Sequence, residues 1–416
     1  MRDIVILGST GSIGSQTLDV IRERRDQFRV AALTAGGSNI PLLAEQILEF
    51  APPLVALSRP TAVQDLQLAL YAAAKQRGWA TGEMTLPKIV AGPEANLEAA
   101  RLPCDLVMNA ITGAAGLTAT LATLEAGTKL ALANKESLVI GGRLVTDKAA
   151  PGQLIAVDSE HSAIAQCLRA GRTQEVRRVI LTASGGPFRG RRREELTEVT
   201  PEQAMKHPTW NMGRVITINS ATLVNKGLEL LEAGLLYDID LDLIEPVVHP
   251  QSIVHSMVEF HDGSTIAQCS PPDMRLPIAL SLSWPDRLAN ASAPIDWTQA
   301  ASWTFEPLDH EAFPAVDLAR RAGQLGGTAP AVFNAANEAC VDAFCAGTLS
   351  FLGIVDTIAR VLDEHVANAE NPEPAGGDVL SSRPRGAGLV GADRVTIDDV
   401  LAADAWARAR AADICA

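Results

Sequence analysis

The octapeptide AVDSEHSA, residues 156–163, places two carboxylates two positions apart directly after the apolar run LIAV. If this segment is extended, Asp158 and Glu160 point to the same face of the strand and repel each other unless a positive group lies between them. A solvated strand end is the plain alternative, since exposed carboxylates are common in a chain with 49 acidic residues. The octapeptide alone favours that alternative, so the decision depends on the motifs around it.

A glycine-rich segment, GSTGSIG at residues 8–14, follows the apolar run DIVIL and opens a helical pattern. Gly8 permits a tight turn, Gly11 lets the backbone approach a pyrophosphate, and Gly14 lets helix and strand pack closely. The exposed N–H groups and the helix dipole favour an anion. A simple turn is the alternative, but the position after the first strand favours a dinucleotide site formed by Thr10, Gly11, Ser12 and Ile13.

The end of the second predicted strand bears on the choice of cofactor. NAD-binding folds usually carry an acidic residue there to accept from the ribose diol, whereas RVAALT runs into AGGSN without one. This favours NADPH, with Gly36 and Gly37 in the turn and with Ser38 and Asn39 as donors to the 2′-phosphate. The turn itself contains no lysine or arginine.

A third polar set lies in NSATLVNKGLELLEAG, residues 219–234, which is otherwise an apolar helical pattern. Asn225, Lys226 and Glu229 are spaced three and four apart, so they occupy adjoining parts of one helix face. An exposed Lys226–Glu229 pair of little consequence is the alternative. Ser220 near the expected helix start and SGGPF at 184–188, a glycine-rich strand end, could both bind a phosphate. The sequence thus offers one cradle for a dinucleotide and one for a substrate.

These motifs need a scaffold, and the first 150 residues alternate short apolar runs with helical patterns. That alternation predicts a doubly wound (Rossmann-like) parallel sheet, with DIVIL, RVAALT, PLVALS, KIVAG, DLVMNAI and KLALAN as strands. Residues 151–300 predict a mixed α/β catalytic domain with RRVILTAS, RVITINS and SIVHSMVEF as strands. After a linker at 301–312, residues 313–416 predict an α-helical bundle.

Composition excludes several classes of protein. A formal net charge of −14 argues against nucleic-acid binding, because no basic excess exists to neutralise phosphates. The six cysteines include no CxxC pair, which argues against a zinc site or a disulfide framework. No apolar run is long enough for a signal peptide or a membrane span. We therefore expect a cytoplasmic protein.

The motifs together resemble one family. GSTGSIG, NKES (134–137), VDSEHSA, SGGPF, HPTWNMG (207–213), SATLVNKGLE, HPQSIVHSMV and NAANE occur in the order found in 1-deoxy-D-xylulose 5-phosphate reductoisomerases, over roughly residues 1–360. The resemblance implies that Asp158, Glu160 and Glu229 are catalytic and hold one divalent cation. Oxygen ligands suit Mg²⁺ or Mn²⁺ better than zinc, and His161 is by the same match not a ligand.

The resemblance also assigns substrate and cofactor contacts. It places the substrate phosphate on Ser184, Ser220, Asn225 and Lys226, with His207 from a neighbouring loop. Ser159 and Glu160 become substrate contacts, and the catalytic Lys135 reaches toward the substrate. It places Asn134 and Glu136 beside the nicotinamide half of NADPH and makes Gly213 a further cofactor contact. HPTWNMG, within residues 204–214, resembles the family's flap, in which Trp210 and Met212 close over the site; such a flap would leave Trp210 exposed in the free enzyme.

The implied reaction converts a phosphorylated α-hydroxy ketone to 2-C-methyl-D-erythritol 4-phosphate, an isoprenoid precursor. Retro-aldol cleavage and re-addition would give a branched aldehyde that NADPH reduces, with the metal as Lewis acid and the flap excluding water. The family further implies a homodimer formed through the strand that carries His255. One departure is that the family often has a lysine in the turn matched here by AGGSN.

Other patterns carry less. DIDLDLIEP at 238–246 lacks the glycine of a calcium loop, with Leu243 in its place. His249, His255 and His261 could share a strand face, but structural roles are expected for them, as for Asn334, Asn337 and Glu338. The Pro/Gly-rich segment 370–392 receives no role. A metal-independent dehydrogenase and a non-catalytic dinucleotide sensor remain alternative functions.

Overall fold

The structure is a computed structural model of the 416-residue chain, and it describes residues 1–79, 85–210, 212–370, 388–392 and 394–416. Most of the segment expected as a loop at 370–392 therefore lies outside the described residues. The chain divides into two compact units, one formed by residues 1–137, 147–158 and 273–292 and the other by 138–146, 159–272 and 293–416. The first unit thus extends beyond the predicted boundary at 150 and takes in a later segment of the chain.

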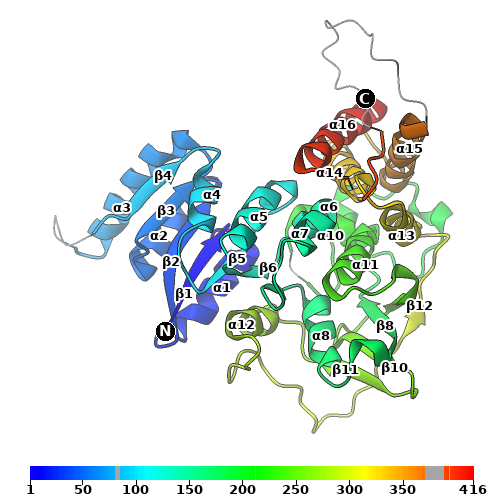
Figure 1. Ribbon diagram of the computed structural model, residues 1–416, viewed down its shortest axis with the longest axis horizontal. Helices are drawn as coiled ribbons and strands as arrows, with labels where there is room; N and C mark the ends of the chain where they lie inside the picture. Colours follow the sequence, from blue (N-terminus) through cyan, green and yellow to red (C-terminus); the bar gives the residue numbers. More distant parts are fainter. Residues whose placement is uncertain (80–84, 211, 371–387, 393) are drawn as a thin grey trace, which may run out of the picture. The chain divides into compact units, whose positions relative to one another are not determined.

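The first unit contains a seven-stranded parallel sheet in the order β4-β3-β2-β1-β5-β6-β7 (Figure 1). Its strands are β1 (Arg2–Leu7), β2 (Phe28–Ala35), β3 (Leu54–Leu57), β4 (Lys88–Ala91), β5 (Leu106–Asn109), β6 (Lys129–Leu132) and β7 (Leu154–Ala156). The order reverses between β1 and β5, which is where doubly wound sheets bind ligands beyond the carboxyl ends of their strands. The predicted Rossmann-like sheet is confirmed, with β7 as an additional strand.

Helices cover this sheet: α1 (Ser12–Arg22), α2 (Ile40–Phe50), α3 (Val63–Gln76), α4 (Ala95–Ala100), α5 (Leu117–Glu125) and α12 (Arg275–Ser283). The strands are apolar and lie in the core, with Ile4, Ile6 and Leu33 fully buried. Residues 277–283 of α12 are buried as well, and this helix packs against α1. Because α12 is apolar on all sides, it needs the packing surface that the first unit supplies.

The second unit contains a mixed sheet in the order β11-β10-β8-β9-β12. Its strands are β8 (Val176–Ala183), β9 (Ile244–Val248), β10 (Val254–Phe260), β11 (Thr265–Cys269) and β12 (Glu306–Pro307), of which only the β8–β9 pair is parallel. The helices nearest the candidate site are α6 (Lys135–Gly141), α7 (Arg143–Thr146), α8 (Ser159–Leu168), α9 (Pro201–Ala204), α10 (Arg214–Ala221) and α11 (Val224–Tyr237).

The C-terminal part of the second unit is helical, as predicted. It comprises α13 (Ala315–Leu325), α14 (Ala329–Ala346), α15 (Phe351–Glu370) and α16 (Ile397–Cys415). The central helix α14 packs against the other three (Figure 1), and its Phe333 and Phe344 are almost completely buried. Among the described helices, none is both long enough and apolar enough to cross a membrane.

Two elements differ from the sequence prediction. RVITINS, expected as a strand, forms helix α10, which Gly213 precedes in an extended conformation and in which Thr217 Oγ1 donates to the Gly213 carbonyl at 2.8 Å. Its branched residues suit either element, and only the packing of the buried Ile218 and Ala221 decides. The single helix expected over residues 219–234 is interrupted because Leu223 adopts a left-handed conformation with φ of 61°.

Candidate functional site

The two carboxylates of the octapeptide do not lie on an extended strand. Strand β7 ends at Ala156 and α8 begins at Ser159, so Asp158 precedes the helix and Glu160 lies in its first turn. Glu229 comes from the middle of α11 and is buried. One carboxylate oxygen from each of Asp158, Glu160 and Glu229 lies within 4.8 Å of the others. The structure therefore brings together the three carboxylates that were predicted to act together.

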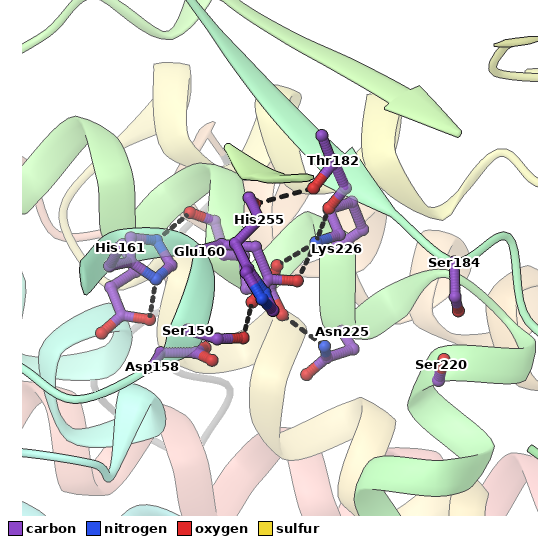
Figure 2. Close-up of polar contacts among 12 residues, drawn as sticks. Asp158, Ser159, Glu160, His161, Thr182, Ser184, Ser220, Asn225, Lys226 and His255 are labelled. Atoms are coloured by element: carbon purple, nitrogen blue, oxygen red, sulfur yellow. Dashed lines mark hydrogen bonds and ion pairs between the residues drawn. The ribbon is translucent and has the colours of Figure 1, made fainter. Parts of the chain in front are cut away.

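Two lysines supply the positive charge that this acidic group requires. Lys226 Nζ lies 3.0 Å from Glu160 Oε1 and also donates to Glu229 and to the Thr182 carbonyl (Figure 2). Lys135 Nζ lies 2.5 Å from Asp158 Oδ2. Burial lowers the pKa of Lys226, but the Glu160 and Glu229 carboxylates outweigh burial and raise it above its ordinary value. The alternative of an exposed Lys226–Glu229 pair is therefore wrong.

The position of Lys226 differs from its predicted contact with a substrate phosphate. Its side chain is directed to the carboxylates, away from Ser184 and Ser220 (Figure 2). Asn225, the neighbouring residue, donates through Nδ2 to Glu229 Oε1. Both residues thus hold Glu229 in the structure, and a role in phosphate binding would need other rotamers.

His161 connects the two helices that carry the acidic group. Its Nε2 lies 2.8 Å from the Glu229 carbonyl oxygen, which can only accept, so this nitrogen carries the proton. Its Nδ1 lies 3.3 Å from Glu232 Oε2, and both side chains are buried. Tyr237 Oη donates to the His161 carbonyl at 2.5 Å. These contacts fix α8 against α11 and so set the separation of Glu160 and Glu229.

The donor set fits a hard divalent cation. Asp158, Glu160 and Glu229 offer oxygen atoms alone, which suits Mg²⁺ or Mn²⁺. A second grouping, Asp158 with His161 and Glu232, is also close enough to hold an ion. In that grouping one ligand would be the Nδ1 nitrogen of His161, and Mg²⁺ and Mn²⁺ prefer oxygen ligands to nitrogen. The all-carboxylate group is therefore the better candidate. Sequence reasoning missed Glu232, although its three-residue spacing from Glu229 places both on one helix face.

A second polar cluster gathers three of the residues expected to bind a phosphate. His207 Nε2 lies 3.1 Å from Ser184 Oγ and 3.0 Å from Ser220 Oγ. Ser184 follows β8, and Ser220 lies in the last turn of α10, so the expectation that Ser220 begins a helix is wrong. The cluster nevertheless presents two hydroxyls and an imidazole together.

The backbone fixes the tautomer of His207. Its Nδ1 accepts from the backbone N–H groups of Thr209 at 3.1 Å and Trp210 at 2.9 Å, so in the neutral ring the proton is on Nε2. Burial lowers the pKa of His207. The neutral imidazole therefore holds the start of the HPTWNMG segment and points its N–H toward the two serines.

The glycines after β8 create the space beside this cluster. Gly185 and Gly186 have φ values of 82° and 66°, and a Cβ on Gly186 would lie 2.7 Å from the Ser220 carbonyl oxygen. The Gly186 N–H donates to Ser184 Oγ at 3.2 Å. Only glycine allows this loop to approach the end of α10 so closely.

Trp210 in the expected flap is partly buried, which corrects the expectation that it is exposed. Its ring centroid lies 6.4 Å from that of His255, at a tilt of 57°. His255 is itself buried and bonds through Nε2 to the Ser270 carbonyl at 3.1 Å. Asn211, the next residue of the segment, lies outside the described residues. His249 follows β9 whereas His255 lies in β10, so these two histidines do not share the strand face that the sequence suggested.

The dinucleotide loop has the geometry that its glycines predict. Gly8 has a φ of 84°, and a Cβ there would lie 2.6 Å from the Ala110 carbonyl oxygen. A Cβ on Gly14 would lie 2.3 Å from the Gly8 carbonyl oxygen. Gly11 precedes α1, and Gly11 and Ser12 are exposed while Thr10 and Ile13 are partly so. The loop presents the start of α1 as an anion site.

Of the remaining residues expected to contact NADPH, one is buried and hydrogen-bonded within the protein, and two are accessible to a ligand. Asn134 is buried and engaged by its own fold: Nδ2 donates to the Ile111 carbonyl and, at 2.8 Å, to that of Gly113, while Oδ1 accepts from Ser137 N at 2.7 Å. It shapes the loop after β5 and has little capacity left for a cofactor. Glu136 is partly exposed, and Gly213 is exposed at the start of α10.

Comparison with known proteins decides the family. Residues 4–142 match the profile of 1-deoxy-D-xylulose 5-phosphate reductoisomerase, and residues 154–237 and 269–410 match two C-terminal domains of the same enzyme. A relative of that name from Cutibacterium acnes is 66% identical over 100% of this chain and 99% of its own. One from Kitasatospora griseola is 55% identical over 99% of this chain and 100% of its own. The chain belongs to the 1-deoxy-D-xylulose 5-phosphate reductoisomerase family.

Solved structures of the reductoisomerase family share the fold over the whole chain. The Zymomonas mobilis enzyme in complex with NADPH is 40% identical, with a TM-score of 0.83, and the match covers 100% of this chain and 99% of that one. A structure with NADPH, fosmidomycin and magnesium is 35% identical, with a TM-score of 0.85, over 100% and 98% of the two chains.

Proposed function

We propose that this protein is an NADPH- and divalent-metal-dependent reductoisomerase that converts 1-deoxy-D-xylulose 5-phosphate to 2-C-methyl-D-erythritol 4-phosphate for isoprenoid biosynthesis. The observation that carries the proposal is the convergence of Asp158, Glu160 and Glu229 within 4.8 Å. Three carboxylates in one place form a cation site, which an ordinary dehydrogenase does not need. The identity of the substrate is inferred from membership of the reductoisomerase family.

The residues present fit both cofactors. Gly8 and Gly14 leave no room for a side chain at the head of α1, so the backbone can approach a pyrophosphate. The carboxylates of Asp158, Glu160 and Glu229 would hold the cation. When bound, the cation supplies Lewis acidity toward the ketone and hydroxyl oxygens of the substrate, and NADPH supplies the hydride.

The side chains of the protein position the substrate. Ser184, His207 and Ser220 would bind its phosphate, with the Gly185–Gly186 turn beside them. Ser159, whose Oγ donates to Glu160 Oε2 at 2.6 Å, is poised to contact the substrate hydroxyls, and Lys135 beside Asp158 would reach the substrate. The segment from His207 to Gly213 would close as a flap, so that the cleaved fragments recombine before water or diffusion removes them.

Lys226 shares Glu160 and Glu229 with the proposed cation. In the structure the amine balances these carboxylates, so a bound cation would compete with the lysine for the same two residues. A move of Lys226 toward the phosphate, as the family resemblance implies, is compatible with this competition. We further propose a homodimer formed through the mixed sheet, whose edge strand β11 has its Thr265, Ile266 and Ala267 exposed.

The test is an assay of NADPH absorbance with purified protein and 1-deoxy-D-xylulose 5-phosphate. We expect oxidation of NADPH that requires the ketose phosphate, stops with EDTA and returns with added Mg²⁺ or Mn²⁺. Oxidation that is insensitive to EDTA would support a metal-independent dehydrogenase. NADPH binding without any turnover would support a dinucleotide sensor.

A further inference from the structure

The AGGSN turn that follows β2 lies beside a residue from another part of the chain. Strands β2 and β3 pair in parallel with Ala35 opposite Leu57, so the residues after both strands emerge at the same edge of the sheet. Gly36 and Gly37 follow β2, and Arg59 follows β3 at the start of the short helix η1 (Pro60–Ala62). An arginine is therefore placed beside the AGGSN turn, which has no cationic residue of its own.

The contact between Arg59 and this turn is direct. Arg59 Nε donates to the Gly36 carbonyl oxygen at 3.0 Å. Gly37 has a φ of 92°, and a Cβ there would lie 3.4 Å from Arg59 Nε, 3.5 Å from Nη2 and 2.9 Å from the Cβ of Ala62. The absence of a side chain at Gly37 lets the guanidinium approach the turn closely, and the hydrogen bond through Nε holds it there.

The rest of the guanidinium remains available for a ligand. In the part of the chain that the structure describes, Arg59 makes its side-chain hydrogen bond through Nε, and no carboxylate lies within ion-pair distance of its guanidinium. Other arginines of the first unit differ, since Arg22 and Arg25 are paired with Glu49 and Arg77 with Glu45. An exposed, uncompensated guanidinium held in place by backbone is suited to a phosphate in a protein whose net charge is −14.

Asn39, the last residue of the AGGSN turn, offers a second hydrogen-bond donor for a phosphate. Asn39 caps α2, and its Oδ1 accepts from Leu42 N at 3.2 Å. The cap uses the oxygen and leaves the Nδ2 donor of this exposed side chain for a ligand. A carboxylate that would favour the ribose diol of NAD is missing from the turn.

We propose that Arg59 binds the 2′-phosphate of NADPH and sets the preference of this protein for NADPH over NADH. The inference rests on the proposed function for the cofactor, and it adds the residue that discriminates between the two nicotinamides. Arg59 would supply the positive charge that a lysine within the turn supplies in other members of the family. The Nη atoms would donate to the phosphate while Nε keeps its hydrogen bond to the Gly36 carbonyl oxygen.

The experiment measures dissociation constants of NADPH and NADH by nicotinamide fluorescence, with the full chain and without substrate. The variants are Arg59→Met and Arg59→Lys, with Arg29→Met as a matched control. Arg29 is the second residue of β2, at the end of the strand opposite the AGGSN turn, and it pairs with Asp3. Melting temperatures of all variants verify that they are folded.

We expect Arg59→Met to weaken NADPH binding by about tenfold or more while NADH binding is nearly unchanged, because one charged hydrogen-bond partner is lost. Arg59→Lys should retain part of the preference, and Arg29→Met all of it. Equal weakening of both cofactors would reduce Arg59 to a structural role and overturn the inference. Unchanged NADPH binding in Arg59→Met would also overturn the inference about Arg59. Turnover of the ketose phosphate by the wild type would in that case still support the proposed function. A wild type that binds neither nicotinamide would overturn both.

Discussion

Glu229 shows how the environment of one residue changes its interpretation. Its spacing from Lys226 is that of an ordinary surface pair, yet the carboxylate is 1% exposed and shares Lys226 with Glu160. A buried carboxylate costs several kcal/mol of desolvation unless it is paired. The sequence could identify the residues of this group but could not show the lysine between them, because that contact joins segments 66 positions apart.

Glu229→Gln tests which acidic group holds the metal. The amide keeps the shape but removes one anionic ligand, so Mn²⁺ affinity should fall by about 10-fold or more, and turnover should fall severely. NADPH affinity should be unchanged. Calorimetric titration with Mn²⁺ measures the metal affinity, and Glu232→Gln is the comparison. If Glu232→Gln lost the metal and Glu229→Gln kept it, the group of Asp158, His161 and Glu232 would be the site.

The protonation of His207 provides a prediction for the pH dependence. Its Nδ1 accepts from two backbone N–H groups, and a proton on that atom would remove both hydrogen bonds. Burial depresses the pKa of His207, so this anchoring is complete above the ordinary pKa of about 6.5 and is lost as pH falls through the depressed value. Tryptophan fluorescence of the free protein should therefore change with a midpoint below about 6.5.

Two variants verify the origin of that change. His207→Gln removes the titrating ring, and Trp210→Phe removes the nearest reporter. Each should abolish the transition. A transition that persists in His207→Gln, or a wild-type midpoint above the ordinary histidine pKa, would show that His207 does not control the segment.

At the scale of elements, the parallel strands were predictable because they are short apolar runs, and the inner strands are buried by the sheet on both faces. The helices α13 to α16 were predictable from their period. RVITINS was assigned wrongly, since local pattern did not distinguish its strand and helix forms, and the left-handed Leu223 left no signal in the sequence. For these two reasons Ser220 was predicted near the start of a helix, whereas it lies in the last turn of α10.

The flap gives a prediction at this scale. Trp210 is partly buried and meets His255 at 6.4 Å, a contact worth about 1 kcal/mol, so Trp210→Ala should change the melting temperature little. If the segment closes over substrate, the variant should raise KM for the ketose phosphate and lower kcat. Trp406→Ala is the matched control, because Trp406 is 7% exposed and its truncation should cost about 3–5 kcal/mol. A large loss of stability with normal kinetics in Trp210→Ala would show a core anchor.

For the whole molecule, the sequence predicted three regions along the chain, whereas the structure forms two compact units. Residues 273–292 return to the dinucleotide-binding unit, and the apolar pattern of α12 does not reveal which unit it joins. Residues 159–272 and 293–416 form one unit instead of two domains, because α11 packs against α13 and the two share a core. Length and composition set the number of cores only approximately.

The central claim is that the protein rearranges a carbon skeleton before reducing it, and the methyl signal of the product tests this most directly. Proton NMR of the product from 1-deoxy-D-xylulose 5-phosphate, NADPH and Mg²⁺ separates the two outcomes. In 2-C-methyl-D-erythritol 4-phosphate the methyl group is attached to a carbon without hydrogen, so the account predicts a singlet. Direct reduction of the ketone would place the methyl beside a CH group, and a doublet would contradict the account.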